Sequence, residues 1–480
     1  MSTPDPGTAP APLPGPGAPG RPRLLLSAFL MATPGHILEG LWRHPRAQQD
    51  RYDELSLWTD LARQLEDARF DAMFFADVVG LYGDHRGGWD TFVREGIQIP
   101  SLDPSVMLSA LGAVTEHIGL AWTSSVIQEH PFTFARRAAT LDHLTRGRVG
   151  WNIVTSALEN AHRNYGLPGL TPHDERYAWA EEYVDVVYKL LEGSWDDDAE
   201  VKDRAAGVFS VPGRIHKVHH RGERYSVEGP HLVAPSPQRT PVLFQAGTSP
   251  VGMDFAARNA EAVFMFAGSP AGAAKVTTTV RRLAVEHGRR ADDVKFFTGL
   301  SLVVGSTEAE ARRLKADYDE HLSVEGLAAH MLGGMGVDLG DAPVDTRLKD
   351  LEVQGVRGVH QAIIDSVPGG DPTIEDMVRY RSEMMRLVGT PEQVADRLEQ
   401  WQDAGVDGIN IINHVLPDSY TEVVEGLLPE LRRRGLAQEE YAPGTFREKL
   451  FGRQDGGRLD ERHPAARFRG AFGGPEGSSA

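Results

Sequence analysis

The sequence predicts an α/β fold, a TIM (β/α)8 barrel, because short apolar segments alternate with helical patterns eight times along the chain. Each apolar segment gives way to polar or small residues, as barrel strands do where they open onto the rim that carries chemistry. The eight predicted strands are residues 23–30, 72–77, 118–126, 148–156, 241–248, 262–266, 295–305 and 408–413.

These segments are rich in Val, Ile, Phe and Leu without strict alternation, which is typical of parallel strands buried on both faces. Helical stripes fill the gaps between them; Trp58, Leu61 and Leu65 belong to one such stripe, and residues 183–191 carry another. A doubly wound sheet is the competing fold. It would normally carry a glycine-rich turn after its first strand, and residues 31–36 are no such turn.

The chain has 480 residues, 41% of them hydrophobic, which is enough for one large core. Its net charge of −18 argues against binding to nucleic acid, whose phosphates require a basic surface. The absence of cysteine excludes thiol catalysis, disulfides and thiolate metal sites. No apolar run approaches the roughly 18 residues of a membrane span, and the first residues do not resemble a secretory signal. A cytoplasmic protein is therefore expected.

Changes in composition divide the chain into three parts. Residues 1–22 are rich in Pro, Gly and Ala and are predicted to be disordered. Residues 23–435 form the predicted barrel, with insertions at about 195–240 and 325–388. Residues 436–480 form a C-terminal extension whose end is predicted to be disordered. Because insertions after barrel strands lie at the catalytic rim, the second insertion is a candidate lid.

Polar residues at the predicted strand ends are candidates for a binding site. Asp77 and Asn152 end the second and fourth strands, and Ser249 lies between the fifth strand and a helix. Their mixed types suit a flat, hydrogen-bonding cofactor better than a metal ion, and Ser249 would meet an anion at a helix start. Each also has a plain structural alternative: Asp77 and Ser249 could cap helices, and Asn152 could bond loop backbone.

Several motifs resemble the bacterial-luciferase-like FMN-dependent monooxygenases, in the group that contains nitrilotriacetate, pristinamycin IIA synthase and dibenzothiophene sulfone monooxygenases. Within this group the chain is most similar to long-chain alkane monooxygenases and next to dimethyl sulfide monooxygenases. The motifs include Leu41-Trp42-Arg43-His44-Pro45, Ala76-Asp77-Val78-Val79-Gly80, Trp151-Asn152-Ile153-Val154-Thr155-Ser156, His173-Asp174-Glu175-Arg176-Tyr177 and Gln245-Ala246-Gly247-Thr248-Ser249.

The resemblance implies a two-component enzyme that uses FMNH2 from a separate NAD(P)H:flavin reductase. Oxygen would form a flavin C4a-hydroperoxide that oxygenates an apolar small molecule, possibly a long-chain alkane; an organosulfide or a natural product is the alternative. The cofactor-binding residues it implies are Asp77, Thr123, Ser125, Asn152, His173, Tyr177, Gly247 and Ser249. It also implies a homodimer or homotetramer.

For substrate and oxygen chemistry the resemblance points to His36, Tyr82, Gln98 and His330. A histidine beside the flavin can donate or accept a proton, because its pKa ordinarily lies near neutrality. Each of these histidines could instead be structural. Two positions depart from the alkane enzymes: Thr33 stands where they have cysteine, and Ala157 where they have histidine.

Other site chemistries find less support. His216, His219 and His220 follow an acidic run at residues 196–198, but hairpin spacing does not place them on one side as a metal-binding helix would, so no metal is expected. No strand is followed by the Gly-rich nicotinamide motif. A non-oxygenating flavin- or F420-dependent oxidoreductase and a binding barrel with a dead site remain the alternatives.

Overall fold

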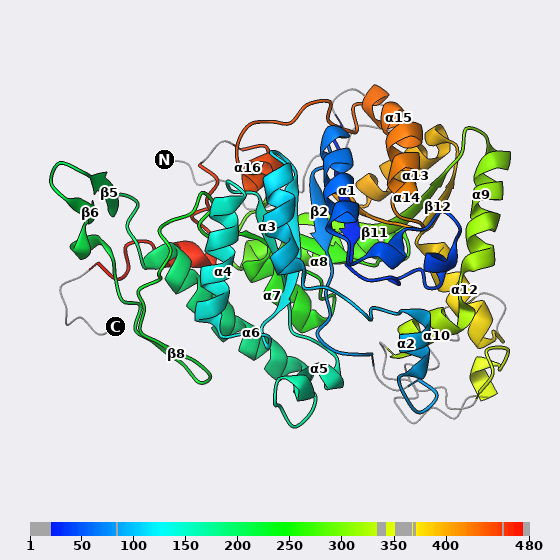
Figure 1. Cartoon of the computed structure of the whole chain (residues 1–480), viewed down its shortest axis with the longest axis horizontal. Coiled ribbons are helices and arrows are strands. Elements are labelled where there is room, and N and C mark those ends of the chain that lie inside the picture. Colours follow the sequence, from blue (N-terminus) through cyan, green and yellow to red (C-terminus); the bar gives the residue numbers. More distant parts are fainter. Residues whose placement is uncertain are drawn as a thin grey trace.

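A computed structural model describes residues 21–82, 85–333, 342–350, 367, 371–453 and 456–473. Eight parallel strands form a closed barrel surrounded by helices (Figure 1). The barrel strands are β1 (Leu25–Leu30), β2 (Ala72–Phe75), β3 (Gly119–Ser125), β4 (Val149–Val154), β9 (Val242–Gln245), β10 (Ala262–Met265), β11 (Lys295–Val304) and β13 (Gly408–Ile412).

Each barrel strand pairs with the next along the chain, and β13 pairs with β1 to close the ring, with Leu25 opposite Gly408. All eight predicted strands are confirmed, and each lies within its predicted segment. Closure excludes the doubly wound alternative, whose open sheet would leave two free edges. The prediction missed β12 (Arg386–Gly389), which pairs with the far end of β11 as a ninth strand.

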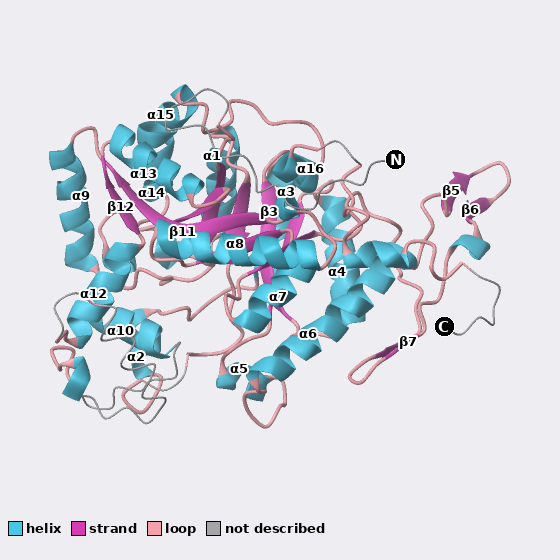
Figure 2. Ribbon diagram, turned by 180° about the vertical axis from the view of Figure 1, so that it is seen from behind, coloured by secondary structure: helices cyan, strands magenta, loops and turns pink. Residues whose placement is uncertain are grey.

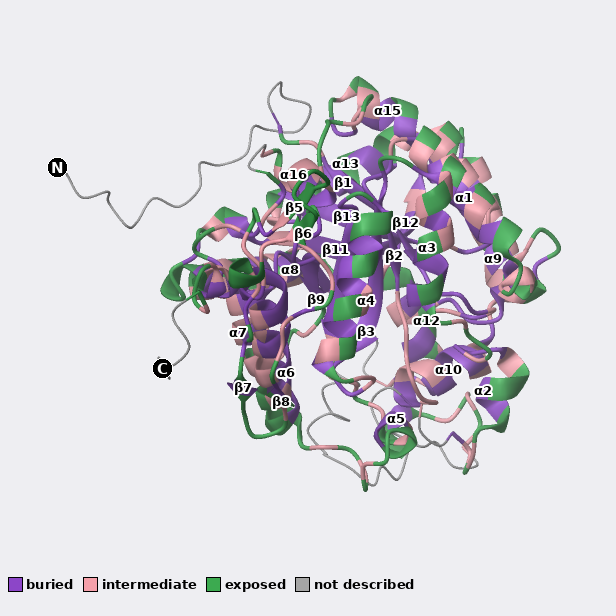
Figure 3. Ribbon diagram, turned by 60° about the vertical axis from the view of Figure 1, so that its left-hand side comes forward, coloured by how far each residue is buried: buried purple, intermediate pink, exposed green. Residues whose placement is uncertain are grey.

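The barrel interior is packed with aromatic rings, so it is a core and not a channel. Phe74 contacts Phe244 and Phe264, with ring centroids 5.4 Å and 5.8 Å apart. Gly150 makes room for this packing, because a Cβ there would lie 2.9 Å from the ring of Phe244. The outward residues of the strands pack against the helices, whose inner sides are buried and outer sides exposed (Figure 3).

Helices cover the outside of the barrel (Figure 2). The predicted stripes are confirmed in α1, where Trp58, Leu61 and Leu65 are buried, and in α6 with the turn that follows it. The helices of the barrel layer are α1 (Leu55–Asp67), α3 (Pro104–Val114), α4 (Pro131–Leu144), α6 (His173–Tyr188), α7 (Pro250–Asn259), α8 (Pro270–Glu286), α9 (Glu308–His321), α13 (Pro391–Asp403), α14 (Asp418–Glu422) and α15 (Leu428–Arg433).

The first insertion carries two small hairpins between α6 and β9. The hairpin of β5 (Glu200–Asp203) and β6 (Val208–Ser210) projects from the body of the protein (Figure 1). The predicted hairpin near residues 216–229 is present as β7 (His220–Arg221) and β8 (Ser226–Val227). Because this insertion follows a helix and precedes a strand, it does not belong to the loops at the carboxyl ends of the strands.

The second insertion lies near loops that follow barrel strands. Its helix α10 (Val324–Gly333) packs against α2 (Asp90–Glu95), from the segment after β2, and against α12 (Ile374–Met384) (Figure 1). The short helix α5 (Glu159–Asn164) follows β4. Residues 368–370 of this insertion lie outside the described residues.

The C-terminal extension closes the end of the barrel opposite the catalytic rim. Phe446, the first residue of α16 (Phe446–Phe451), stacks on Phe244 with ring centroids 6.2 Å apart. The next residue, Arg447, is buried and paired with Glu261 at 2.6 Å. The disorder predicted for both termini concerns residues 1–20 and 474–480, which lie outside the described residues. Among the helices that the structure describes, none has the length and apolarity to cross a membrane.

Candidate active site

A cavity of about 440 Å3 opens where β2, β4 and β9 end. This is the rim at which TIM barrels place their chemistry. Five of the residues that the sequence singled out line it. They are Asp77, Tyr82, Ala157, Tyr177 and Gly247. Apolar side chains such as Val79, Leu158 and Phe255 make up much of the remaining wall.

Asp77 stands at the end of β2 with its carboxylate largely withdrawn from water. Burial raises the pKa of Asp77 to about 7, and the nearby charge of Asp103 adds to this effect. Hydrogen bonds from the Val78 backbone and the Gln128 side chain act in the opposite direction. At neutral pH the carboxyl group is therefore poised between its charged and neutral forms, so it can donate or accept a hydrogen bond.

Thr123, Ser125 and Asn152 lie on neighbouring strands and are all buried. Thr123 is in register with Asn152 and accepts a hydrogen bond from its Nδ2 at 3.0 Å. Asn152 Oδ1 is buried without a hydrogen-bond partner among the described residues. Ser125 Oγ lies 2.9 Å from Ser156 Oγ. An unpaired buried amide oxygen at the barrel rim is a place where a bound molecule can complete the hydrogen bonding.

Two helix starts stand beside the cavity, next to Tyr177, which lines it. Ser249 caps α7, accepting a hydrogen bond from Gly252 N, which is the structural role that the sequence offered as the alternative to anion binding. Its hydroxyl lies 3.2 Å from Nε2 of His173, the first residue of α6. Tyr177, one turn further along α6, packs its ring 5.2 Å from that of His173. Free N–H groups at two helix starts make this corner suitable for an anion.

Gly247 and Gln245 complete this corner. A Cβ at Gly247 would overlap Tyr177 Oη and Gln245 Nε2, so only glycine lets the chain pass so close. Gln245 Nε2 donates to Tyr177 Oη at 3.4 Å, while its Oε1 is buried without a partner among the described residues. The cavity therefore offers hydrogen-bonding groups such as Asp77 and Gln245, and the two helix starts stand beside it, next to Tyr177.

The four candidate residues for substrate chemistry also come together. Gln98 Nε2 lies 3.3 Å from His330 Nε2, and the Tyr82 ring stands edge-on to the His330 ring at 4.8 Å. Burial raises the pKa of Tyr82 to about 12. Burial, with a smaller contribution from the neighbouring His330, lowers the pKa of His36 to about 3. His36 is thus neutral near pH 7. Helix α10 brings His330 next to Tyr82 and Gln98.

An aromatic cluster adjoins these residues. Phe29 lies 4.8 Å from His36 and 4.7 Å from Phe264, measured between ring centroids. Phe266 packs on Phe264 at 4.7 Å, yet 46% of its surface remains exposed. An exposed phenyl ring at the mouth of the barrel offers an apolar contact to a bound molecule.

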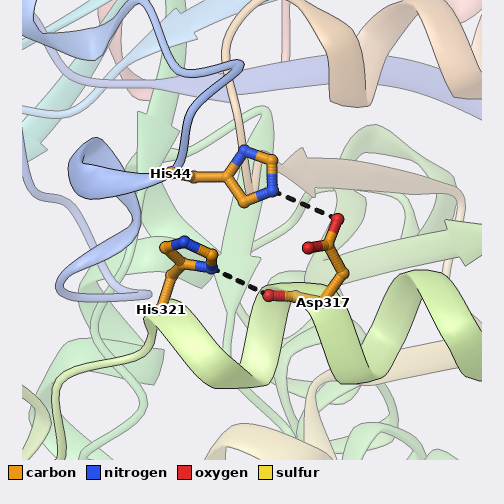
Figure 4. A group of neighbouring side chains, drawn as sticks. All are labelled: His44, Asp317 and His321. Carbon is orange, nitrogen blue, oxygen red and sulfur yellow. Dashed lines mark hydrogen bonds and ion pairs between the residues drawn. The ribbon is translucent and has the colours of Figure 1, made fainter.

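His44, Asp317 and His321 form a cluster that the sequence did not suggest (Figure 4). His44 Nε2 lies 3.2 Å from the Asp317 carboxylate, and His44 Nδ1 accepts from Arg46 N. His321 Nδ1 lies 2.9 Å from the Asp317 carbonyl oxygen. These ring nitrogens are already engaged within the protein, so we interpret the cluster as a latch that joins α9 to the segment after β1.

The histidines of the first insertion have separate partners. His216 Nε2 lies 3.1 Å from Asp196, whereas His220 contacts Lys189 at 2.9 Å and Glu182 at 3.3 Å. They belong to different hydrogen-bonded groups in the described structure.

Sequence reasoning missed three residues of the site. Gln245 was quoted only as part of a motif, although its position at the end of a strand was a usable signal. Gln128 bonds Asp77 and Ser125 from the loop after β3, where no pattern marked it. Glu39 lies in irregular chain after β1 and is completely buried.

A model of the luciferase-like monooxygenase family matches residues 37–408. The chain is 42% identical to dimethyl-sulfide monooxygenase from Hyphomicrobium sulfonivorans over 95% of either protein. It is 41% identical to long-chain alkane monooxygenase from Geobacillus thermodenitrificans over 93% of this chain and 98% of that protein. The chain belongs to the luciferase-like monooxygenase family. It is a flavin-dependent monooxygenase, which uses its flavin in the reduced form.

Solved structures agree with this assignment. The structure of DmoA from Hyphomicrobium sulfonivorans matches with a TM-score of 0.88 and 42% identity, over 94% of this chain and 96% of that one. A structure of long-chain alkane monooxygenase matches with a TM-score of 0.85 and 41% identity, over 93% and 99%. Because the two sequence identities are nearly equal, they do not distinguish a sulfide from an alkane as the substrate class.

Proposed function

We propose that this monooxygenase is the oxygenase of a two-component system and that its flavin is FMN. A separate NAD(P)H:flavin reductase supplies FMNH2, and one atom of O2 enters an apolar organic substrate. The observation that carries the proposal is a cavity lined by hydrogen-bonding groups such as Asp77 and Gln245, with two helix starts beside it. The absence of a Gly-rich nicotinamide motif supports a separate reductase. We propose a cytoplasmic homodimer or homotetramer.

The residues present fit FMN. The flavin ring system would be bordered by Asp77, Thr123, Ser125 and Asn152. Asn152 Oδ1, which has no hydrogen-bond partner among the described residues, could accept a hydrogen bond from the ring. The phosphate would bind at His173, Tyr177 and Ser249, where both helix starts favour negative charge. Gly247 lets the chain pass close to Tyr177 and Gln245 in this corner, where a larger residue would collide with them.

Bound FMNH2 supplies the two electrons that activate O2, so that RH + O2 + FMNH2 gives ROH + H2O + FMN. His330 Nε2 can hold or move a proton, with Gln98 and Tyr82 orienting it. The neutral ring of His36 can accept a hydrogen bond without adding charge to the apolar side of the pocket. α10 and the loops after β1 and β2 would keep water from the reacting groups.

The aromatic cluster of Phe29, Phe264 and Phe266 beside His36 favours an apolar substrate. We propose a long-chain alkane as one class, which the similarity to long-chain alkane monooxygenase supports. An organosulfide is the second class, supported by the similarity to dimethyl-sulfide monooxygenase. Sulfur accepts oxygen from reduced flavin and O2 more readily than an unactivated C–H bond does, which favours the second class chemically.

Two measurements test this proposal. Anaerobic titration with photoreduced FMN should show binding, with free riboflavin weaker because it lacks the phosphate. The loaded enzyme, coupled to any flavin reductase under 18O2, should then be offered alkanes of increasing length and dialkyl sulfides. We expect one labelled oxygen atom per product molecule. Flavin oxidation without labelled product from any apolar class would support a non-oxygenating oxidoreductase instead.

A further inference from the structure

Glu39 is a buried carboxylate outside the groups assigned to the flavin or the substrate. It lies in the loop after β1, and none of its surface is exposed to solvent. Glu39 Oε1 lies 2.7 Å from His330 Nδ1. Glu39 Oε2 has no hydrogen-bond partner among the described residues. The histidine is therefore the one described side chain that hydrogen bonds this carboxylate.

Two glycines from separate segments make the space that Glu39 occupies. A Cβ at Gly326, on α10, would lie 3.0 Å from the Cβ of Glu39. A Cβ at Gly35, in the loop itself, would overlap Glu39 Oε2. Left-handed backbone at Ile37 (φ 70°) and Gly40 (φ 91°) folds the loop around the carboxylate. This backbone costs free energy at Ile37, which is not glycine, so the surrounding contacts must hold the loop in place.

Burying a carboxylate with so few hydrogen bonds is unfavourable unless a partner offsets the cost. Because a carboxylate can only accept, Nδ1 of His330 must donate to Glu39 across the 2.7 Å contact. The other ring nitrogen, Nε2, is then unprotonated in the neutral ring. Nε2 faces Gln98 at 3.3 Å and lies beside Tyr82, which lines the cavity. A carboxylate that fixes the tautomer of a histidine in this way prepares the opposite nitrogen for proton transfer.

We propose that Glu39 is a positioning residue for His330. It fixes the ring with Nδ1 protonated and Nε2 directed to the cavity, and it stabilises the ring when Nε2 takes up a proton. The inference rests on the proposed function, in which His330 handles a proton near the flavin.

Other groups near His330 do not provide this counter-charge. His36 is held neutral by burial, and Tyr82 is a neutral phenol near pH 7. Glu325, also on α10, is instead paired with His85 and Arg86. In the described parts of α2 and α12, no charged side chain pairs with His330. Glu325 is thus a matched control, because it joins α10 to the β2 side without touching that ring.

The main experiment is a double-mutant cycle of Glu39→Gln and His330→Ala. Glu39→Gln should lower product formed per FMNH2 oxidised about tenfold or more, with a matching rise in hydrogen peroxide. In both proteins the product yield should fall as the pH rises. In Glu39→Gln this fall should occur at a lower pH than in the wild type, because the protonated His330 ring has lost the negative charge of Glu39. In the His330→Ala background the same change should have almost no further effect. Glu325→Gln should leave the pH profile unchanged.

A second readout does not depend on flavin. In protein with 15N-labelled histidine, the His330 ring should show the Nδ1–H tautomer, and Glu39→Ala should mix the two tautomers. If Glu39→Gln folds poorly, Glu39→Asp keeps the charge and should retain the wild-type pH profile at reduced yield. A wild-type pH profile in Glu39→Gln, an equal loss in the His330→Ala background, or an unchanged tautomer would overturn the inference. Failure of FMNH2 binding in the wild type would instead refute the proposed function.

Discussion

Ser249 and His173 join the starts of two helices: Ser249 Oγ lies 3.2 Å from His173 Nε2, where α7 and α6 begin. Neither helix start alone would indicate more than an ordinary cap. Together they bring a hydroxyl and an imidazole to one corner beside the cavity, and Tyr177, one turn further along α6, lines that cavity. This convergence makes the corner a phosphate site in our proposal, and it can be tested separately from catalysis.

Ser249→Ala combined with Tyr177→Phe should weaken FMN binding while leaving the fold intact. Each change removes a hydrogen bond to a charged group, worth about 1.5–3 kcal/mol, so the dissociation constant should rise about a hundredfold or more. Ser269→Ala is the matched control, because Ser269 caps α8 through Gly272 N and precedes a proline in the same way. Equal FMN titrations for the double variant and this control would remove Ser249 and Tyr177 from the phosphate site.

Asp77→Asn should change how stability depends on pH. The folded-state pKa of Asp77 is about 7 against an ordinary 3.8, so the folded protein favours the protonated form. The stability that protonated Asp77 contributes to the folded protein is complete below about pH 3.8. It is lost as the pH rises from there through 7, at ~1.4 kcal/mol for each pH unit. Asparagine cannot ionise, so the flavin-free variant should be more stable than the wild type at pH 8 by a few kcal/mol, but not at pH 4.

Denaturant titrations of the flavin-free proteins at pH 4, 6 and 8 measure this difference. Asp60→Asn serves as control, since Asp60 is exposed and pairs only with Arg63 among the described side chains. A difference between Asp77→Asn and the wild type that stays constant with pH would show that Asp77 is ionised like an ordinary surface carboxylate.

The sequence predicted those parts of the molecule in which a local pattern carries the information. Runs such as the one before Asp77 are apolar because strands of a closed barrel are buried on both faces, so all eight strands could be found. Asn152 and Ser249 could be proposed as site residues because strand ends share one rim. β12 could not be distinguished, because its four residues follow a helix and pair only with an extension of β11.

Glu39 and Gln128 were missed for a different reason. Glu39 is surrounded by left-handed backbone and by a glycine almost three hundred residues away, so no periodicity reveals that it is buried. Gln128 reaches Asp77 from a loop. His330 was named only through resemblance, because its place in the site depends on how an insertion folds. The positions of these residues therefore depend on long-range contacts of irregular segments, which a local sequence pattern does not reveal.

Gly35→Ala should destabilise the protein by about 1–3 kcal/mol, because the added methyl group must displace buried neighbours. Its Cβ would overlap Glu39 Oε2 and lie 2.8 Å from the Gly96 carbonyl oxygen. Gly213→Ala is the control: no atom lies within 4 Å of its added Cβ, and its φ is not positive. Thermal denaturation of both variants compares the two environments. If the two variants shift the midpoint of thermal denaturation equally, the packing around Glu39 accommodates a methyl group, contrary to the structure.

Thr33→Cys with Ala157→His should shift substrate preference towards alkanes. Ala157 lines the cavity, so replacing it by histidine changes the wall that a substrate contacts. Thr33 is buried, and its hydroxyl has no partner among the described residues. A thiol is easier to leave unpaired, so the replacement makes that position more apolar. Both changes introduce the residues that the resemblance to the alkane enzymes implies at these positions.

The measurement is the ratio of kcat/KM for a long-chain alkane to that for a dialkyl sulfide, in the wild type, both single variants and the double variant. Competition experiments in one reaction mixture remove differences in flavin supply. We expect the wild type to favour the sulfide and the double variant to raise the ratio by about tenfold, the effect of ~1.4 kcal/mol between the two transition states. Variants that fold and bind FMN but keep the wild-type ratio would place the determinant of specificity elsewhere, with the exposed ring of Phe266 as the next position to change.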